Sequence, residues 1–591
     1  MGMIYYPTFV PDEGPLDAKI LIVGEAPGEQ EVESKRPFVG HSGEILLQCL
    51  NRAGVSRDEV RLANLFHYRP YGNKFEIVKD LPELKESVRQ LYDYIEEHKP
   101  NVIAALGNWP LHYLTGRATF NNKKQIGGIS KWRGSILPYI MNSELKVIPA
   151  FHPAFITRNR SAYPTFDFDI TRIVNDAAYR ERRYRQRRYI VNPQNLEIER
   201  WTEELLAASY LAVDIETIKN SSKILCVGFA PSPELAVCFV SSNFQHRLAI
   251  ERVLAGRNKK VFQFGTFDTI QLLKLNGYTL ADDTAQGLER PYYWDTNIAQ
   301  HVMMPELPRS LEYLTSIYTR EPYYKTEGRA NIPDDTKGWS EKVDKNELYI
   351  YNCKDCCCTA EIFEEQQKEI AANPLFERIF NFEMTALSVA IDISNAGLPI
   401  DHARRKMLGD FLLSKWERKQ FALDMLVGRE VNVNSTPTVK KVLYDKEYLG
   451  LPVRRDHEGK ETTGEDAIVS LISYCKDRMD TVVKDTTKQE WKERLAICKA
   501  ILEIRGIRKV LSSYIRPKGS DDGRIRSTYK VGGTETGRWS ASKYVDGTGL
   551  NAQTLPRDPI EVPDEVIEAA LALAKQLEEE ENEEAAEDNP E

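Results

Sequence analysis

The sequence lacks the segments that carry a chain into or across a membrane. It has no run of 18 uncharged apolar residues, and its first residues do not place a basic segment before an apolar one. Cysteine is also scarce, with nine cysteines spaced irregularly over 591 residues, which favours reduced thiols over a disulfide framework. We therefore expect a cytoplasmic protein that has no membrane partner.

The sequence also lacks the net positive charge of many nucleic-acid-binding proteins. Its formal net charge is −9, but residues 578–591 carry nine acidic side chains and no Lys or Arg, so the rest of the chain is neutral. Because phosphate contacts are local, a neutral body with basic patches can still bind DNA. The acidic tail itself is typical of a solvated, disordered segment, which serves solubility or binds another protein.

The length and three composition breaks indicate several domains. A chain of 591 residues is too long for one core, so three or four domains are expected. The breaks fall at an arginine-rich stretch, YRERRYRQRRY, at AANP, and after Pro556. We expect multidomain α/β architecture followed by a mainly helical region, with segments 1–178, 179–195 (a basic linker), 196–372, 373–558 and 559–591 (the acidic tail).

Buried strands in the first segment are followed by polar side chains. Strands are predicted at 19–23, 101–106 and 145–150, alternating with helices, which indicates an α/β sheet with function at the strand ends. The motifs at these ends, GEAPGEQE with PFVG, NLFHYRP, ALG and FHPAF, supply a carboxylate, an aromatic ring, an amide and an imidazole. Cleaving a glycosidic bond needs a carboxylate and a donor for the departing base, and the base must leave the stack.

Together these motifs resemble the uracil-DNA glycosylase superfamily, most closely its branch with an iron–sulfur cluster, over residues 15–178. The resemblance implies that Glu25 orients the water, Phe38 stacks on the uracil, Asn64 reads its edge and His152 steadies the leaving base. An inactive module that is used only for binding is the alternative.

The cysteines that the branch uses for its cluster are missing. The first twenty residues contain no cysteine, Tyr68 occupies the third cluster position and Ser87 falls near the fourth. Cys49 alone cannot hold a cluster. We therefore expect no iron–sulfur cluster in this chain.

The middle segment carries carboxylates in metal-binding spacing. In YLAVDIET, period-two alternation puts Asp214 and Glu216 on one face of a strand, and adjacent carboxylates favour a cation such as Mg²⁺ or Mn²⁺. Asp268 is predicted to head a helix that follows a strand. Tyr351 and Asp355 are four residues apart and share one face of a predicted helix.

In this order the residues resemble the DEDD proofreading 3′–5′ exonucleases, tyrosine subclass, of family A DNA polymerases, over residues 196–372. The resemblance implies two-metal hydrolysis in which Tyr351 orients the attacking water and two Mg²⁺ or Mn²⁺ ions are bound. The implied metal ligands are Asp214, Glu216, Asp268 and Asp355. Phe264 stands where the family usually has Asn, so a DNA contact is expected to differ.

Four cysteines in YNCKDCCCTA surround the last of these aspartates. A zinc site would need further ligands that the sequence does not pair with them. We expect Cys353, Cys356 and Cys357 to pack the helix against the sheet.

The last third resembles the thumb and the first part of the palm of family A polymerases. The segments TYKVGGTETGRWSAS and LNAQTLPRD carry the likeness, which implies that Lys509, Arg538, Asn551 and Gln553 lie along primer-template DNA. No palm carboxylate motif follows in residues 559–591, so we expect a split or truncated polymerase, which a second polypeptide with palm and fingers would complete. A bacteriophage source is expected from this domain order.

The expected function is therefore that of a DNA replication protein with a metal-dependent proofreading exonuclease, acting on single-stranded 3′ ends and primer-template DNA. The first alternative is a uracil-repair glycosylase with an accessory exonuclease. The second is a non-catalytic DNA-binding scaffold.

Overall fold

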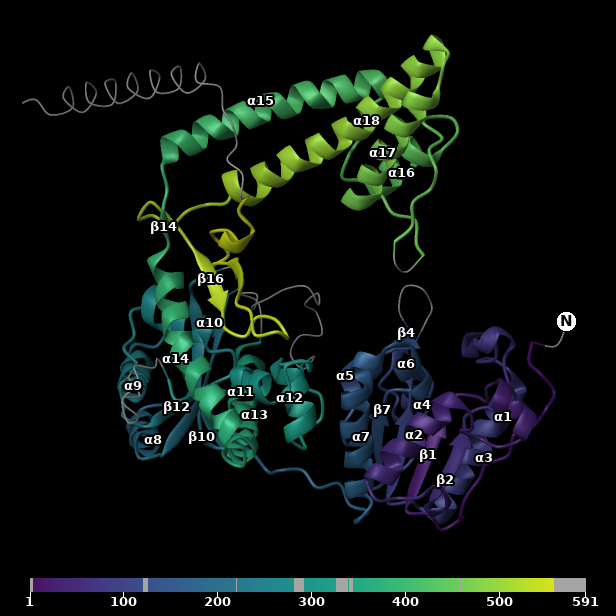
Figure 1. Ribbon diagram of the computed structural model, residues 1–591. Helices are drawn as coiled ribbons and strands as arrows, with labels where there is room; N and C mark the ends of the chain where they lie inside the picture. The colour runs from purple at the N-terminus through teal and green to yellow at the C-terminus, as the bar shows by residue number, and fades with distance from the viewer. Residues whose placement is uncertain are drawn as a thin grey trace, which may run out of the picture. The chain divides into compact units, whose positions relative to one another are not determined.

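The chain forms two compact units in the computed structural model (Figure 1), one comprising residues 1–391 with 530–539 and the other residues 392–529 with 540–591. None of the described helices combines the length and the apolar character needed to cross a lipid bilayer. The predicted acidic tail, 559–591, lies outside the described residues. The described residues are 4–120, 126–218, 221–280, 292–325, 339, 344–456 and 459–556.

The first domain is built on a five-stranded sheet in which four strands run parallel. Strands β1 (Ile20–Gly24), β3 (Val102–Leu106) and β7 (Lys146–Ala150) are buried along their whole length, since helices cover both faces of the sheet. Leu21 and Val23 join one hydrophobic cluster, with α3 (Pro82–His98) and α4 (Asn108–Thr115), whereas Ile20 and Ile22 join the other, with α2 (His41–Arg52) and α7 (Tyr163–Asp176). The three predicted strands are thus confirmed. In sheet order the strands are β2 (Val60–Asn64), β1 (Ile20–Gly24), β3 (Val102–Leu106), β7 (Lys146–Ala150) and the antiparallel β6 (Leu137–Pro138).

The helices of this domain connect the strands and begin at the edge where the parallel strands end. Helix α4 begins two residues after the end of β3 and α6 three residues after the end of β7, whereas longer loops follow β1 and β2. The α-helices are α1 (Glu29–Ser34), α2 (His41–Arg52), α3 (Pro82–His98), α4 (Asn108–Thr115), α5 (Ile129–Trp132), α6 (Pro153–Arg158) and α7 (Tyr163–Asp176), and β4 (Thr119–Phe120) pairs with β5 (Ile126–Gly127).

The middle domain contains a six-stranded mixed sheet on which one long helix lies. Helix α13 (Lys345–Ala371) packs across β9 (Tyr210–Thr217), β10 (Ile224–Ser232) and β11 (Leu235–Val240). Gly228 of β10 permits this close approach, because a Cβ atom there would lie 2.2 Å from Asn352 Oδ1 and 2.7 Å from Cys356 Sγ. In sheet order the strands are β13 (Trp294–Asp295), β12 (Lys259–Phe262), β9 (Tyr210–Thr217), β10 (Ile224–Ser232), β11 (Leu235–Val240) and β8 (Arg188–Val191). The α-helices are α8 (Leu196–Leu206), α9 (Phe244–Leu254), α10 (Thr266–Thr269), α11 (Thr296–Met303), α12 (Leu311–Tyr318) and α13 (Lys345–Ala371).

Strand β8 falls within residues 179–195, which the sequence predicts to be a linker. The strand runs parallel to β11 at the edge of the sheet, so the folded domain begins earlier than predicted. The arginine just before it has buried partners: the side chain of Arg187 is 3% exposed and lies 2.6 Å from Glu361 and 3.2 Å from Glu321. These carboxylates come from distant parts of the chain, so the arginine run alone could not indicate a buried edge.

The second unit is mainly helical, as predicted. Its hydrophobic core is formed by Leu423, Val439, Ile468 and Ile501 together with their neighbours on α15 to α18. The elements are the end of α14 (Pro374–Ala396), then α15 (His402–Val427), α16 (Thr436–Tyr444), α17 (Glu465–Thr481) and α18 (Asp485–Val510), with the strand pairs β14 (Leu398–Pro399) with β15 (Arg524–Ile525) and β16 (Ser527–Lys530) with β17 (Ser540–Lys543).

Candidate active sites

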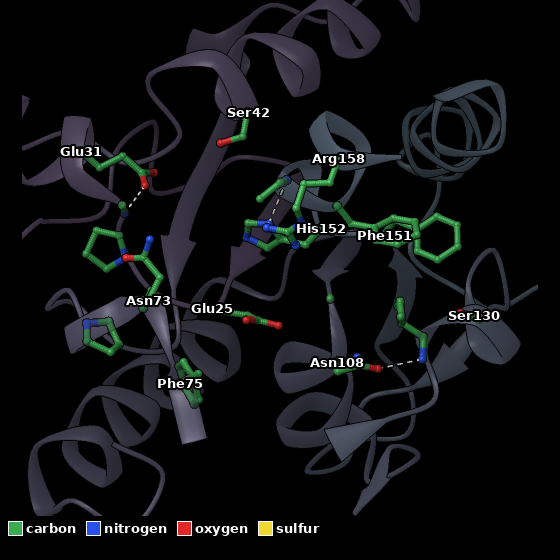
Figure 2. A pocket seen from close by; sticks show the side chains of 18 residues that line it. Glu25, Glu31, Ser42, Asn73, Phe75, Asn108, Ser130, Phe151, His152 and Arg158 are labelled. Atoms are coloured by element: carbon green, nitrogen blue, oxygen red, sulfur yellow. Dashed lines mark hydrogen bonds between the residues drawn. The ribbon is translucent and has the colours of Figure 1, made fainter. Parts of the chain in front are cut away.

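A cavity of about 530 Å³ lies at the carboxyl ends of the parallel strands of the first domain. Glu25 follows β1, Gly107 follows β3 and His152 closely follows β7, so the sheet brings them together (Figure 2). Gly107 has φ +100°, and a Cβ atom there would lie 2.7 Å from Glu25 Oε1 and 3.3 Å from His152 Cβ. A glycine is needed at this point, because a side chain would separate the carboxylate from the imidazole.

Burial and the start of α4 set the protonation of Glu25. Burial raises the pKa of Glu25 to about 7, and hydrogen bonds from the backbone N–H groups of Trp109 and Asn108 act in the opposite direction. A carboxyl group that titrates near neutral pH can hold or accept a proton at an active site.

The imidazole of His152 is neutral and can donate a hydrogen bond. Burial and, to a lesser extent, Arg158 lower the pKa of His152 to about 4. Its Nδ1 atom accepts a hydrogen bond from Ala154 N at 3.2 Å, which assigns the ring hydrogen to Nε2. A neutral N–H donor suits a site that must stabilise a departing anion.

Phe38 and Asn64 do not line this cavity. A Cβ atom on Gly24 would lie 2.5 Å from Asn64 Oδ1 and 2.7 Å from Cζ of Phe38, so both side chains meet beside the end of β1. Both are about 5% exposed. Residues that the sequence did not single out do line the cavity, among them Asn73, Phe75, Asn108, Phe151 and Arg158. These come from loops and from the ends of short helices, whose spacing carries no periodic signal.

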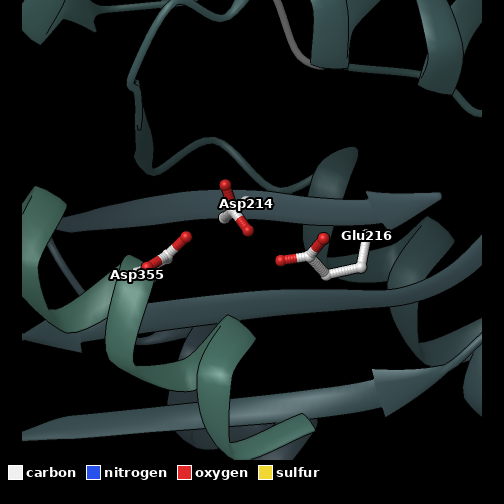
Figure 3. Close-up of side chains that lie close together, drawn as sticks. All are labelled: Asp214, Glu216 and Asp355. Atoms are coloured by element: carbon white, nitrogen blue, oxygen red, sulfur yellow. The ribbon is translucent and has the colours of Figure 1, made fainter. Parts of the chain in front are cut away.

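Three carboxylates gather on the sheet of the middle domain (Figure 3). Asp214 and Glu216 extend from the same side of β9, and Asp355 reaches them from α13. One oxygen of each carboxylate lies within 4.8 Å of one oxygen of each of the others. The predicted period-two and helical spacings thus bring these three side chains to one place.

Asp268 lies beside this group but outside it. Its Oδ1 atom accepts a hydrogen bond of 3.3 Å from the backbone N–H of Ile215 in β9. Burial raises the pKa of Asp268 well above its usual range, and the charge of Asp214 adds to the effect. The fourth predicted ligand is therefore next to the strand that carries the first two.

The carboxylates destabilise one another electrostatically. Burial raises the pKa of Asp214 well above its ordinary value, and Glu216 and Asp355 raise it further. Asn352 of α13 partly offsets this by donating a hydrogen bond of 2.8 Å to Asp214 Oδ2. Such a cluster fits a hard divalent cation, since all its ligand atoms are oxygen.

A lysine that sequence analysis missed contacts the carboxylate of α13. Lys325 Nζ lies 2.7 Å from Oδ1 and 2.6 Å from Oδ2 of Asp355, and 2.9 Å from Oη of Tyr351. Tyr324 Oη also donates to Asp355, and Trp339 Nε1 donates to Glu216. Tyr324 and Lys325 lie outside helices and strands, and Trp339 forms only an isolated bridge with Ile218, so no periodicity pointed to them.

The domain that carries the first of these sites matches a known family. Residues 11–178 match the family described as "Uracil DNA glycosylase superfamily". The type-4 uracil-DNA glycosylase of Thermotoga maritima is 37% identical over 150 residues, which are 25% of this chain and 71% of that protein. Its counterpart from Saccharolobus solfataricus is 32% identical over 166 residues, 28% of this chain and 74% of that protein. The chain belongs to the uracil-DNA glycosylase superfamily.

A second family follows the glycosylase domain. Residues 189–371 match a family described as "3'-5' exonuclease", so the chain joins a glycosylase domain to an exonuclease domain. The DNA polymerase of Bacillus phage SP01 is 26% identical over 229 residues, which are 37% of this chain and 23% of that protein. A solved structure, the POL domain of Pol1 from M. smegmatis in complex with DNA primer-template and dNTP, has a TM-score of 0.44 at 18% identity and covers 64% of this chain and 57% of that chain. The chain thus spans less than a quarter of the phage polymerase and just over half of the solved polymerase chain.

The residues of the glycosylase domain do not fit the iron–sulfur cluster of the branch that the motifs resemble. Tyr68 packs with Tyr5 and Phe66, at ring-centroid distances of 5.2 and 5.5 Å, and Ser87 Oγ lies 3.3 Å from His67 Nδ1. Rings and a hydroxyl provide none of the thiolates that a cluster requires.

The cysteines of the exonuclease domain pack its core, as predicted. Cys353, Cys356 and Cys357 are fully buried on α13. Burial also raises the pKa of Cys356 and Cys357, which keeps these thiols protonated. Among the described residues, the close group of possible metal ligands consists of carboxylates and includes no thiol.

Phe264, at the position where an Asn was expected, takes part in a turn before α10. It has φ +57°, and its N–H group donates to Asp295 Oδ1 at 3.2 Å. Asp295 also accepts from Gly265 N at 2.9 Å and from Tyr292 Oη at 2.7 Å, so a buried carboxylate fixes this turn. A changed DNA contact at Phe264 stays a prediction.

The predicted DNA contacts of the C-terminal region are distributed over both units. Lys509 lines a cavity of about 510 Å³ in the second unit with Arg505, Arg508 and Arg516. The side chain of Asn551 caps a short turn by accepting from the N–H group of Gln553 at 3.1 Å. Arg538 belongs to the segment 530–539 of the first unit and is exposed. Their contact with primer-template DNA stays a prediction.

Proposed function

We propose that this chain is a DNA replication protein whose exonuclease domain removes nucleotides from DNA 3′ ends in a reaction that needs divalent cations. The observation that carries the proposal is the group of Asp214, Glu216 and Asp355 oxygens within 4.8 Å of one another. On primer-template DNA the same reaction would serve as proofreading for a family A polymerase.

The residues that fit divalent ions have separable roles. Asp214, Glu216 and Asp355 would hold one Mg²⁺ or Mn²⁺ ion, and Asp268 beside Asp214 would help to hold a second. Bound ions would stabilise charge on the attacking and leaving oxygens. Tyr351, one helical turn before Asp355, orients the attacking water. The water oxygen bonds to phosphorus, the bond from phosphorus to the 3′ oxygen of the preceding nucleotide breaks, and a 5′-nucleotide leaves.

A primer-end assay tests this proposal. A primer annealed to a template, with its terminal 3′ nucleotide either paired or mismatched, is incubated with the protein and Mg²⁺. We expect faster removal of the mismatched nucleotide and loss of removal in Asp355→Asn. Glu365→Gln, on the same helix at a half-buried side chain that pairs with Lys368, is the matched control and should keep the wild-type rate. Removal that persists in Asp355→Asn would contradict the proposal.

A second function is favoured by the cavity of the glycosylase domain, where Glu25 and His152 meet over Gly107. In this proposal Glu25 orients water toward C1′ of a deoxyuridine flipped out of the helix, and His152 Nε2 donates to the departing uracil. The bond from C1′ to N1 breaks and water adds to C1′. Release of uracil from a labelled duplex tests it. If the wild-type chain binds the duplex but releases no uracil, this domain serves as a DNA-binding module and not as a glycosylase.

A further inference from the structure

Lys325 stands between the two residues of α13 that the exonuclease proposal uses. An ammonium group has three N–H donors and no acceptor. Here the three donors match three acceptors: Tyr351 Oη at 2.9 Å and the two carboxylate oxygens of Asp355 at 2.7 and 2.6 Å. The Lys325 side chain is therefore fully engaged with this pair.

The surroundings hold the ammonium group in this position. The side chain of Lys325 is 16% exposed. Its Nζ atom lies 4.7 Å from the ring centroid of Tyr351 and 5.0 Å from that of Tyr324, so aromatic faces stabilise the charge from two sides. Tyr324 Oη donates to the same carboxylate, which fixes Asp355 from a further direction.

The first consequence concerns the hydroxyl hydrogen of Tyr351. Because Lys325 can only donate, Tyr351 Oη must accept in this contact. The hydroxyl hydrogen of Tyr351 then points to a different acceptor. Lys325 thus sets the direction in which Tyr351 can donate, which is the property that an orienting residue needs.

The second consequence concerns cation binding. Lys325 occupies both oxygens of Asp355, so a divalent ion that binds Asp355 has to displace at least one of these contacts and share the site with a positive charge. Lys325 therefore weakens ion binding while it keeps the ligands in place.

We infer that Lys325 is a positioning residue of the exonuclease site: it orients Tyr351 and Asp355 before the ions bind, and it competes with the ions for Asp355. This inference rests on the proposed exonuclease function. It predicts effects of opposite sign when Lys325 loses its charge, because ion affinity rises whereas the catalytic rate falls. A residue with a merely structural role would lower both.

The test compares Lys325→Met with wild type in the full chain, by two measurements. Electron paramagnetic resonance of free Mn²⁺ gives the dissociation constant without DNA, and nucleotide release gives kcat and KM. We expect the Mn²⁺ dissociation constant to fall about tenfold, since a nearby positive charge is removed. We expect kcat to fall about 30-fold with little change in KM, since orientation and not DNA binding is lost.

Three further variants separate charge, packing and orientation. Lys325→Arg keeps the charge and should keep a Mn²⁺ affinity near that of wild type. Lys354→Met is the matched control: its side chain is 15% exposed and its Nζ atom lies 4.9 Å from the Tyr324 ring, but its ion pair is with Glu321. Both measurements should stay near wild type in this control. In a Tyr351→Phe background, Lys325→Met should change kcat less than about threefold, because the lysine acts through that hydroxyl.

Mn²⁺ affinity that falls together with kcat in Lys325→Met, or that stays unchanged, would overturn the inference. A wild-type chain that binds Mn²⁺ but releases no nucleotide would instead refute the proposed function. In that case the Mn²⁺ titration alone would still decide whether Lys325 competes for Asp355.

Discussion

Each of the two α/β domains buries carboxylates, but the groups that surround these carboxylates differ between the domains. In the exonuclease domain Asp214, Glu216 and Asp355 crowd together, and the pKa of Asp214 is raised by burial and by its neighbours. In the glycosylase domain Glu25 lies beside the neutral His152. Burial raises the pKa of Glu25 to about 7, and hydrogen bonds from two backbone N–H groups partly oppose this rise. A cluster of carboxylates needs cations to stay ionised, whereas a single carboxyl group can serve through its own proton equilibrium. The same residue type therefore supports different chemistry in the two domains.

The largest expected effect breaks the carboxylate cluster. Asp214→Asn should lower nucleotide release about 1,000-fold or more and weaken Mn²⁺ binding, because Asp214 is central to the cluster. Nucleotide release and Mn²⁺ resonance are the measurements. Glu204→Gln, an exposed change on α8, should alter neither. Full activity in Asp214→Asn would show that the cluster is not the active site.

The second-largest expected effect concerns Glu25, the carboxylate in the cavity of the glycosylase domain. Glu25→Gln should lower uracil release about 100-fold, because the amide cannot accept a proton or offset positive charge as the carboxylate does. Single-turnover release from a uracil-containing duplex measures this, with Glu44→Gln, an exposed change on α2, as the control. Nucleotide release by the exonuclease domain should be unchanged. Equal loss of both activities would indicate misfolding rather than a role for Glu25.

The pH dependence sharpens the contrast. Since the ionised form of Glu25 is the active one and its pKa is raised to about 7, uracil release should rise with pH by about tenfold per unit below pH 7 and level off above it. His152, with a pKa lowered to about 4, stays neutral over this range and adds no second step. A rate that is flat between pH 5 and 8 in wild type would argue against Glu25 as the group that titrates.

The smallest effect concerns the thiols. Cys353→Ala, Cys356→Ala and Cys357→Ala should each lower the free energy of unfolding by about 1 kcal/mol through lost packing. Nucleotide release should remain within about twofold of wild type, since the thiols pack the helix and do not bind the ions. Denaturant titration and the nucleotide assay check this. The thiols would instead form a metal site if the Cys→Ala variants lost nucleotide release and if added Zn²⁺ restored release to chelator-treated wild type but not to the variants.

Much of the fold and part of the sites could be predicted because they follow from regular periodicities. The strands of the glycosylase domain are continuous apolar runs, and their ends place Glu25 and His152 at one edge of the sheet. Asp214 and Glu216 share a strand face, and Tyr351 and Asp355 share a helix face. In each case two residues are related by the geometry of one element or one sheet.

The remaining parts depend on contacts between distant segments. Lys325 lies 30 residues before Asp355 and outside regular structure, so its contact with α13 left no pattern in the sequence. Phe38 and Asn64 come from separate segments, and their side chains meet beside Gly24; their contact with a flipped-out base stays a prediction. Strand β8 was hidden in an arginine-rich stretch because the partners of those arginines lie on α13 and near α12.

The proposed exonuclease activity can be tested by the polarity and the cation dependence of DNA degradation. A single-stranded oligonucleotide labelled at its 5′ end is incubated with the wild-type chain and Mg²⁺, with and without excess EDTA. The proposed activity predicts a ladder of 5′-labelled products that shorten stepwise from the 3′ end, complete suppression by EDTA, and no ladder with Asp355→Asn. An intact oligonucleotide in Mg²⁺ or Mn²⁺, or a ladder that persists in EDTA, would contradict it.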